Sequence, residues 1–159
     1  MSGPSVLLVR GLPDDAQELS ALALRSKGYW GYDAAFLDAC RKELTLTAQQ
    51  ASTARVARLG DSVAGFVLLA DHPDGLAGAG ELLMLFVDPP YIGRGVGAAL
   101  LADAIATAAA RGWSWLRIES DPGAEDFYLS HGARRVGVAR SGSIAGRQLP
   151  LLELPVEAS

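Results

Sequence analysis

Three glycines at alternate positions, Gly93, Gly95 and Gly97, stand between an apolar run at residues 82–87 and an Ala- and Leu-rich stretch typical of a helix. Positions without a side chain at the start of a helix leave backbone N–H groups open to an anion, and the helix dipole favours negative charge there. The pattern therefore predicts that a phosphate-bearing ligand binds at this turn.

Two classes of ligand fit these glycines. The pattern Gly93-x-Gly95-x-x-Ala98 satisfies the dinucleotide-binding motif, with Glu119 about 20 residues further on. In that motif the strand runs almost directly into the first glycine, whereas here five residues, two of them prolines, separate Val87 from Gly93. Too little chain follows the helix to complete a doubly wound sheet, and a Walker-type loop is excluded because no Gly-Lys-Ser/Thr follows. A turn that binds no ligand is the remaining alternative.

The same stretch resembles the pyrophosphate loop of the GNAT superfamily of acetyl-CoA-dependent N-acetyltransferases. That family places a Val-x-Pro strand end before a Gln/Arg-x-x-Gly-x-Gly/Ala loop, and this chain has Val87-Asp-Pro89 followed by Ile-Gly-Arg-Gly-Val-Gly. Ile92 stands where the family most often has Gln or Arg. The resemblance implies that acetyl-CoA is the cosubstrate and that it is bound by Phe86, Val87, Ile92, Gly93, Arg94, Gly95, Val96, Gly97 and Ala98.

A second segment, residues 121–137, resembles the family's Asn-x-x-Ala-x-x-Phe-Tyr-x-x-x-Gly-Phe segment. Asp121 suits a helix N-cap, Pro122 the first helical position and Gly132 the helix end, so a helix of about two and a half turns is expected. The resemblance implies that Asp121, where the family has Asn more often, contacts the pantetheine arm. It also implies that the phenol of Tyr128 protonates the departing thiolate.

The attacking amine needs a proton acceptor, because an amine with a pKa of about 10 is mostly protonated at neutral pH. The resemblance and the strand position favour Glu81, at the open end of the central strand, as this base. Glu119, at the end of the neighbouring strand, is the second candidate, and a solvent-facing carboxylate without a role is the alternative for each. In the GNAT fold these two strands splay apart and admit the pantetheine arm.

Two loops, at residues 29–32 and 141–147, correspond to regions that flank the acceptor site in this fold. Their aromatic and polar side chains are candidates to bind the amine acceptor: Trp30, Tyr32, Ser141 and Arg147. Aromatic residues that only anchor their loop to the core are the alternative.

Composition narrows the class of protein. The 159 residues are 50% apolar and 20% charged, which is typical of a single globular domain, here residues 1–159. The net charge of −4, without a basic stripe, disfavours nucleic acid as a partner. Cys40 is the sole cysteine, so an internal disulfide is excluded, and Cys40 is expected to be buried. The two histidines are far apart and lack metal-ligand spacing, so no metal is expected. No apolar segment approaches the ~20 residues of a membrane span, so a cytoplasmic protein without a membrane partner is expected. A homodimer is possible, but the sequence does not decide it.

The periodicity predicts the element order β-α-α-β-β-β-α-β-α-β-β, an α+β sheet with helices on both faces. This is the order of the GNAT fold, which implies a mixed, mostly antiparallel sheet with a splayed strand pair. Asp15 and Glu18 are expected to form a capping box at the first helix, and Asp33 to cap a second helix that runs to about residue 44. A polar linker is expected between that helix and the strand at residues 54–59. A Gly60-Asp61 turn is expected to join this strand to the next one, at residues 63–72.

Overall fold

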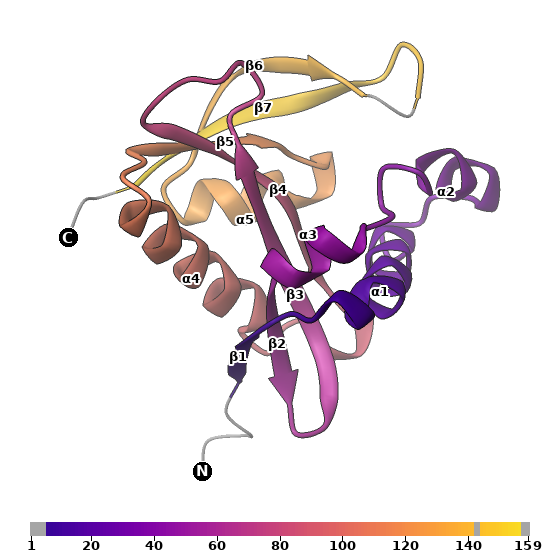
Figure 1. Ribbon diagram of the computed structural model, residues 1–159. Coiled ribbons are helices and arrows are strands. Elements are labelled where there is room, and N and C mark those ends of the chain that lie inside the picture. Colours follow the sequence, from indigo (N-terminus) through magenta and orange to yellow (C-terminus); the bar gives the residue numbers. More distant parts are fainter. Residues whose placement is uncertain (1–5, 142–143, 157–159) are drawn as a thin grey trace. The chain divides into compact units, whose positions relative to one another are not determined.

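Seven strands form one mixed sheet in the order β1-β2-β3-β4-β5-β7-β6 (Figure 1). The computed structural model describes residues 6–141 and 144–156 of the chain. The strands are β1 (Leu7–Arg10), β2 (Arg55–Leu59), β3 (Ser62–Asp71), β4 (Ala79–Val87), β5 (Trp115–Glu119), β6 (Arg134–Arg140) and β7 (Gln148–Pro155). The helices are α1 (Ala16–Gly28), α2 (Ala34–Cys40), α3 (Ala48–Thr53), α4 (Val96–Ala110) and α5 (Glu125–Ser130), with short 3-10 turns η1 (Pro13–Asp15), η2 (Pro89–Tyr91) and η3 (Pro122–Ala124).

The chain forms two compact units, and β3, β4 and α4 each contribute to both. The first unit is Met1–Leu68 with Met84–Asp103, and the second is Leu69–Leu83 with Ala104–Ser159. Among the strand pairs whose register is described, only β4 with β5 is parallel, so the sheet is mixed and mostly antiparallel, as predicted. That the whole chain is a single domain stays a prediction.

In the first unit, β1, β2 and β3 form an antiparallel meander. The two-residue turn Gly60-Asp61 joins β2 to β3 as predicted, with Gly60 in the left-handed region at φ 64°. A Cβ on Gly65 would lie 2.6 Å from the carbonyl oxygen of Phe86 and 3.2 Å from side-chain atoms of Val96 and Leu100. Glycine at this position therefore lets the end of β4 and the start of α4 pack closely on β3.

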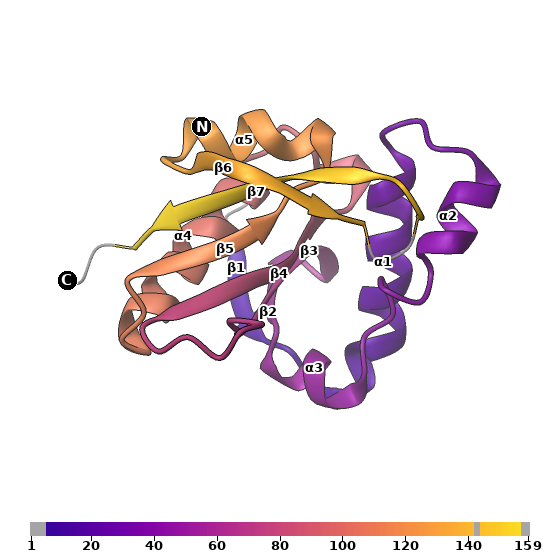
Figure 2. The ribbon, with the colours of Figure 1, turned by 90° about the horizontal axis from the view of Figure 1, so that it is seen from above.

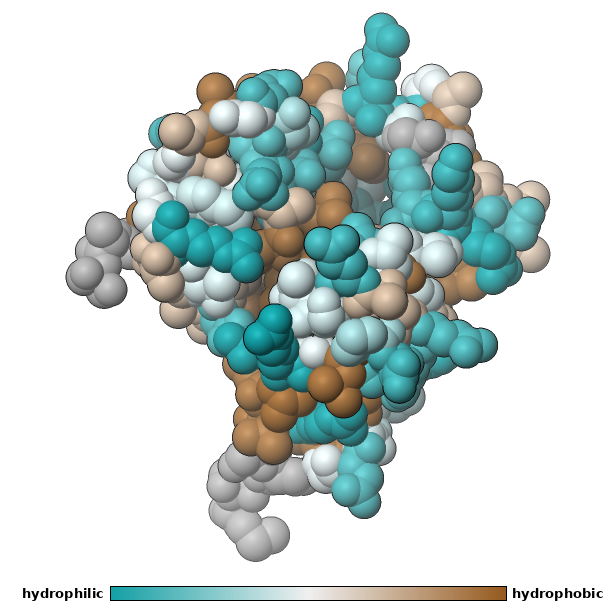
Figure 3. All heavy atoms as spheres, in the orientation of Figure 1, coloured by the Kyte–Doolittle hydropathy of each residue, from teal (hydrophilic) through white to brown (hydrophobic). Residues whose placement is uncertain are grey.

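The core of the first unit is built from buried aliphatic side chains and one phenylalanine: Leu19, Leu22, Val56, Phe66, Leu100 and Leu101. Cys40 is buried, as predicted. Not all apolar side chains are covered, since Leu7 on β1 is 61% exposed, and the apolar surface over β1 is visible in Figure 3. No helix among residues 6–141 and 144–156 has the length and apolar character needed to cross a membrane.

Three predictions of local structure in the first unit are wrong. The expected polar linker contains α3, because Thr47 and Gln50 form a capping box in which each side chain accepts a hydrogen bond from the other's backbone N–H, at 3.0 and 2.9 Å. The expected capping box of Asp15 is absent from α1, because the Asp15 carboxylate instead accepts from the Leu12 N–H at 2.8 Å and closes η1. Asp33 does cap α2, accepting from the Phe36 N–H, but α2 ends at Cys40.

In the second unit, β5, β7 and β6 run side by side in both ribbon views (Figure 2). The start of β4 joins them through Ala79, Gly80 and Glu81, which pair in parallel with Trp115, Leu116 and Arg117. Among the described residues this pairing ends there, although both strands continue. The core of the unit includes four buried side chains that share one face of β5 and β7: Leu116, Ile118, Leu152 and Leu154.

The segment after β5 begins with η3 and continues as α5, where the sequence predicts one helix. Asp121 accepts from the Gly123 N–H at 2.9 Å, which caps η3 rather than a longer α-helix. Gly132, at φ 101°, ends α5 as predicted, and the Ala133 N–H donates to the Tyr128 carbonyl.

Candidate active site

The candidate phosphate loop, residues 92–97, follows η2 and leads into α4 within the first unit. Gly93 and Gly95 lie in the left-handed region, at φ 86° and 80°, where L side chains are rarely found. A Cβ at either position would meet nothing within 4 Å. Backbone conformation, and not crowding, therefore selects glycine at these two positions.

The backbone donors of this loop are largely unused. The N–H groups of Tyr91 and Ile92 donate to carbonyls of the preceding turn, and the N–H of Ala99 donates to Gly95. The N–H groups of residues 93–95 donate no backbone hydrogen bond to any described residue, and all three residues are exposed. Exposed donors at the start of a long helix are the arrangement that binds anions.

The other residues expected at the cofactor lie around this loop. Phe86 and Val87 end β4, and the Phe86 ring lies 6.0 Å from that of Phe66. Ile92 is 40% exposed, and the Arg94 guanidinium lies 5.7 Å from the centroid of the Tyr91 ring. In the first turn of α4, Val96 is buried, Gly97 is half-buried and Ala98 is exposed.

An ion pair that the sequence did not reveal holds Asp88, the residue between β4 and η2. Arg25 of α1 donates two hydrogen bonds of 3.0 Å, from Nε and Nη2, to the two carboxylate oxygens of Asp88. The hydrogen bond to Asp88 raises the pKa of Arg25 above its ordinary value. Because the Asp88 N–H also donates to the Ala64 carbonyl at 2.8 Å, both the backbone and the side chain of Asp88 are held where β4 gives way to η2.

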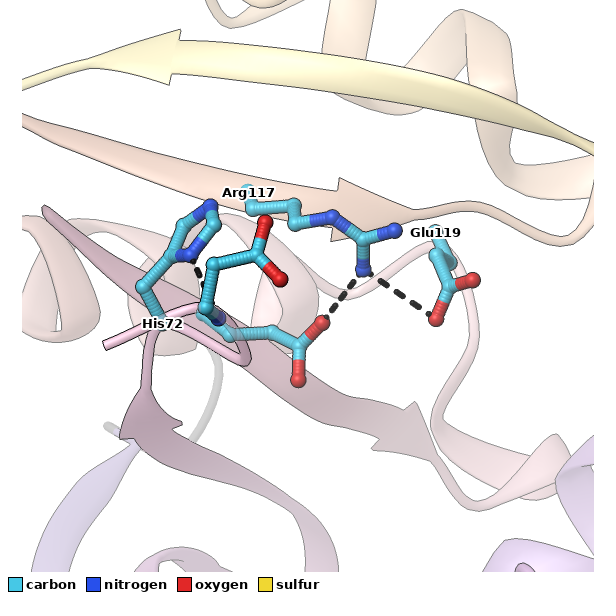
Figure 4. A network of polar contacts seen from close by, with 5 residues as sticks. His72, Arg117 and Glu119 are labelled. Carbon is cyan, nitrogen blue, oxygen red and sulfur yellow. Dashed lines mark hydrogen bonds and ion pairs between the residues drawn. The ribbon is translucent and has the colours of Figure 1, made fainter. Parts of the chain in front are cut away.

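In the second unit, both candidate bases meet at one guanidinium. Glu81 and Arg117 are direct partners in the parallel register, and Nη1 of Arg117 lies 2.7 Å from Oε2 of Glu81. The same Nη1 lies 3.3 Å from Oε2 of Glu119, two residues further along β5 and hence on the same face (Figure 4). The structure therefore brings the two predicted carboxylates together through Arg117, which the sequence analysis did not single out.

The environment of Glu81 makes its carboxyl group more basic than an ordinary one. Glu81 is 8% exposed, and burial raises its pKa above the ordinary value. The hydrogen bond and the charge of Arg117 oppose this shift, Glu119 reinforces it and His72 opposes it weakly, and the net direction is upward. A carboxyl group with a raised pKa is a suitable general base near neutral pH.

His72 lies at the end of this cluster away from Glu119 (Figure 4). His72 is buried, and its Nδ1 accepts from the Asp74 N–H at 3.0 Å. Its ring is edge-on to that of Trp115 at 5.3 Å. Since Nδ1 is an acceptor, the neutral ring carries its proton on Nε2.

Tyr128, the predicted acid, lies in α5 and outside this cluster. Its residue is 5% exposed, its ring contacts that of Phe127 edge-on at 5.2 Å, and burial raises the pKa of its phenol well above the usual range. No hydrogen bond joins the hydroxyl to any of the described residues. The structure thus holds a buried, protonated phenol whose donor is uncommitted within the described chain.

The remaining predicted residues fall in different units. In the second unit, Nη2 of Arg147 lies 3.7 Å from Oδ2 of Asp121, and the Ser141 N–H donates to the Arg147 carbonyl at 2.8 Å. Residues 142–143 of this predicted acceptor loop lie outside the described residues. In the first unit, Trp30 is 47% exposed, and Tyr32 stacks on the Phe36 ring at 4.1 Å.

No cluster of three or more His, Cys, Asp or Glu side chains within the described part of the chain could hold a metal ion.

Comparison with known proteins identifies the class. The sequence model of the acetyltransferase (GNAT) family matches residues 18–133, so the chain belongs to this family, as predicted. The family's general reaction is acetyl-CoA-dependent N-acetylation. No curated protein matches the sequence.

Solved structures agree with the fold. An acetyltransferase of the GNAT family from Desulfovibrio desulfuricans has a TM-score of 0.76 at 22% identity, over 96% of this chain and 100% of that one. The PaiA N-acetyltransferase from Thermoplasma acidophilum, solved in complex with coenzyme A, has a TM-score of 0.73 at 18% identity, over 95% and 99%. The ribosomal-protein-S18-alanine N-acetyltransferase from Escherichia coli has a TM-score of 0.69 at 17% identity, over 98% and 96%.

Proposed function

We propose that this chain transfers the acetyl group of acetyl-CoA to a primary amine of a small molecule or a protein by direct attack. The observation that carries the proposal is the exposed glycine loop at the start of α4 in a chain of the GNAT family. The coenzyme A complex of a protein with this fold supports acetyl-CoA as the cosubstrate. In this proposal the N–H groups of the loop bind the pyrophosphate, and the backbone of Phe86 and Val87 with Asp121 contacts the pantetheine arm.

The reaction needs a base and an acid. Glu81 takes a proton from the acceptor ammonium, and the free amine then attacks the thioester carbonyl carbon. A C–N bond forms, the C–S bond breaks, and the second proton leaves the nitrogen to solvent. Tyr128 donates its proton to the departing thiolate and recovers one from solvent. Glu119 is the second candidate for the base.

The candidates for acceptor recognition are aromatic and polar side chains. Trp30 and Tyr32 are candidates to pack on the acceptor, and Ser141 and Arg147 to bind its polar groups. The acceptor would be found by screening amines and protein N-termini for thiol release from acetyl-CoA. Three results together would support the proposal. Thiol release depends on one class of acceptor, it falls in Tyr128→Phe, and mass spectrometry shows an amide as the product.

A non-catalytic acyl-CoA-binding module is the second candidate, and one observation favours it: the carboxylate of Glu81 already binds Arg117. Binding of acetyl-CoA without thiol release from any acceptor would support that alternative. The dinucleotide-binding oxidoreductase considered from the glycine pattern requires a doubly wound parallel sheet, whereas this sheet is mixed and mostly antiparallel.

A further inference from the structure

Arg117 is bound by two carboxylates of unequal burial. The Glu81 side chain is 11% exposed and the Glu119 side chain 37%, and both approach the same nitrogen, Nη1, at 2.7 and 3.3 Å. One guanidinium nitrogen is thus divided between two carboxylates. The three side chains together carry one net negative charge when all are ionised.

The contact is made by only one oxygen of the deeper carboxylate. Arg117 binds Oε2 of Glu81, and among the described residues Oε1 accepts no hydrogen bond. A carboxylate held at one oxygen keeps a defined orientation, because rotation about its terminal torsion would break a short, charge-assisted hydrogen bond. Its second oxygen is therefore presented in a fixed direction.

We propose that Arg117 is a positioning residue for acetyl transfer: it holds Oε2 of Glu81, leaves Oε1 to receive the acceptor's proton, and is shared with Glu119. This inference rests on the proposed function. Arg117 itself touches neither the amine nor the thioester in this account; it acts through the carboxylate that does.

Charged and titratable groups surround Glu81 within its unit. β5 supplies Arg117 and Glu119, and the segment after β3 supplies His72. β7 places Glu153 directly opposite Arg117 in the antiparallel register, and so on the same face of the sheet. Any test of Arg117 must therefore separate its effect from those of Glu119 and His72.

The positions of these charges predict opposite pH shifts for two variants. Arg117→Gln removes the cation that favours ionised Glu81, so the acidic limb of the kcat/KM profile moves to higher pH. Glu119→Gln removes a nearby negative charge and leaves Nη1 to Glu81 alone, so the limb moves to lower pH. Arg117→Gln also lowers kcat/KM on the plateau by about 10- to 100-fold, because a misplaced base loses its alignment.

Controls separate positioning from folding. Arg117→Lys keeps the charge but not the planar guanidinium, so the limb stays near its wild-type position while the plateau remains low. Arg55→Gln breaks a pair with Asp103 in the first unit and serves as the matched Arg-to-Gln change, with an unchanged profile. The pH profiles of Arg117→Gln and Glu119→Gln are also measured in a His72→Gln background, where their opposite shifts must persist.

A measurement without turnover completes the test. The side-chain ¹³C resonance of Glu81, identified by its loss in Glu81→Gln, is titrated in the free protein. Its midpoint rises in Arg117→Gln and falls in Glu119→Gln if the inference holds. Equal profiles and midpoints in an active wild type and both variants would overturn the inference alone. A wild type that neither binds acetyl-CoA nor releases thiol would overturn the proposed function as well.

Discussion

Arg25 of α1 and Asp88, the residue after β4, are joined by two parallel hydrogen bonds of 3.0 Å between guanidinium and carboxylate. Sixty-three positions separate them in the sequence. The Asp88 side chain is 14% exposed, so the end of β4 is held just before η2, which leads into the candidate phosphate loop. We infer that α1 helps to set the position of the loop through Asp88.

Arg25→Ala should therefore weaken acetyl-CoA binding. A bidentate, half-exposed pair contributes about 1 kcal/mol, so the dissociation constant should rise about fivefold if the loop loses its alignment. Calorimetric titration measures this change. Arg41→Ala, which removes only an exposed pair with Asp38, should leave the constant unchanged; an equal constant in Arg25→Ala would refute the anchoring role.

Gly95→Ala tests the loop conformation itself. Its Cβ would meet no neighbour, so the cost is the left-handed backbone, about 1–2 kcal/mol for an L side chain. The loop can relieve this strain by leaving its conformation, and acetyl-CoA affinity should then fall about tenfold or more. Gly60→Ala in the β2–β3 turn carries the same kind of strain and equally open space. Gly60→Ala should lower the melting temperature about as much as Gly95→Ala does, but it should leave the affinity for acetyl-CoA unchanged.

Tyr128→Phe should separate stability from activity. The Tyr128 hydroxyl is buried and has no hydrogen-bond partner in the described part of the chain. Such a hydroxyl is unfavourable, so its removal should raise the free energy of unfolding by about 0.5–1 kcal/mol. Loss of the general acid should lower kcat by about 100-fold or more, with acetyl-CoA affinity nearly unchanged. Denaturation in urea and thiol-release kinetics give the two values. A fully active variant would remove Tyr128 from the mechanism.

Glu81→Gln should change the pH dependence of stability in a defined direction. Burial raises the pKa of Glu81 in the folded protein above that in the unfolded chain, so folding favours the protonated form. The stability of the wild type relative to Glu81→Gln should therefore fall as pH rises from about 4 through the folded pKa, and then level off. Urea denaturation between about pH 4 and 8 measures this difference. Exposed Glu43→Gln is the control, and a difference that grows with pH would show that Arg117 outweighs burial.

Local signals in the sequence predicted much of the fold. The Gly60-Asp61 turn, the Asp33 cap and the helix end at Gly132 each depend on residues within a few positions, and each is confirmed. Thr47 and Gln50 carry the same kind of signal, because their capping box begins α3 where the sequence analysis predicts a polar linker.

Contacts between distant positions could not be predicted in the same way. The pairing of Glu81 with Arg117 depends on the parallel register of β4 and β5, and a shift of one residue would turn Arg117 to the other face. The pairing of Arg25 with Asp88 requires α1 to be placed beside the end of β4. The sequence identified Glu81 and Glu119 as candidate bases but not the cation that joins them, and the roles of both stay predictions.

The central claim is that the loop at Gly93 and Gly95 binds the pyrophosphate of acetyl-CoA. Calorimetric titration of the wild-type protein with acetyl-CoA, free CoA and NAD in parallel tests it most directly. We expect acetyl-CoA and CoA to bind with dissociation constants on the order of 1–100 µM, and NAD to give no heat. If neither acetyl-CoA nor CoA gave heat of binding, the glycine loop would be a structural turn and the account would be contradicted.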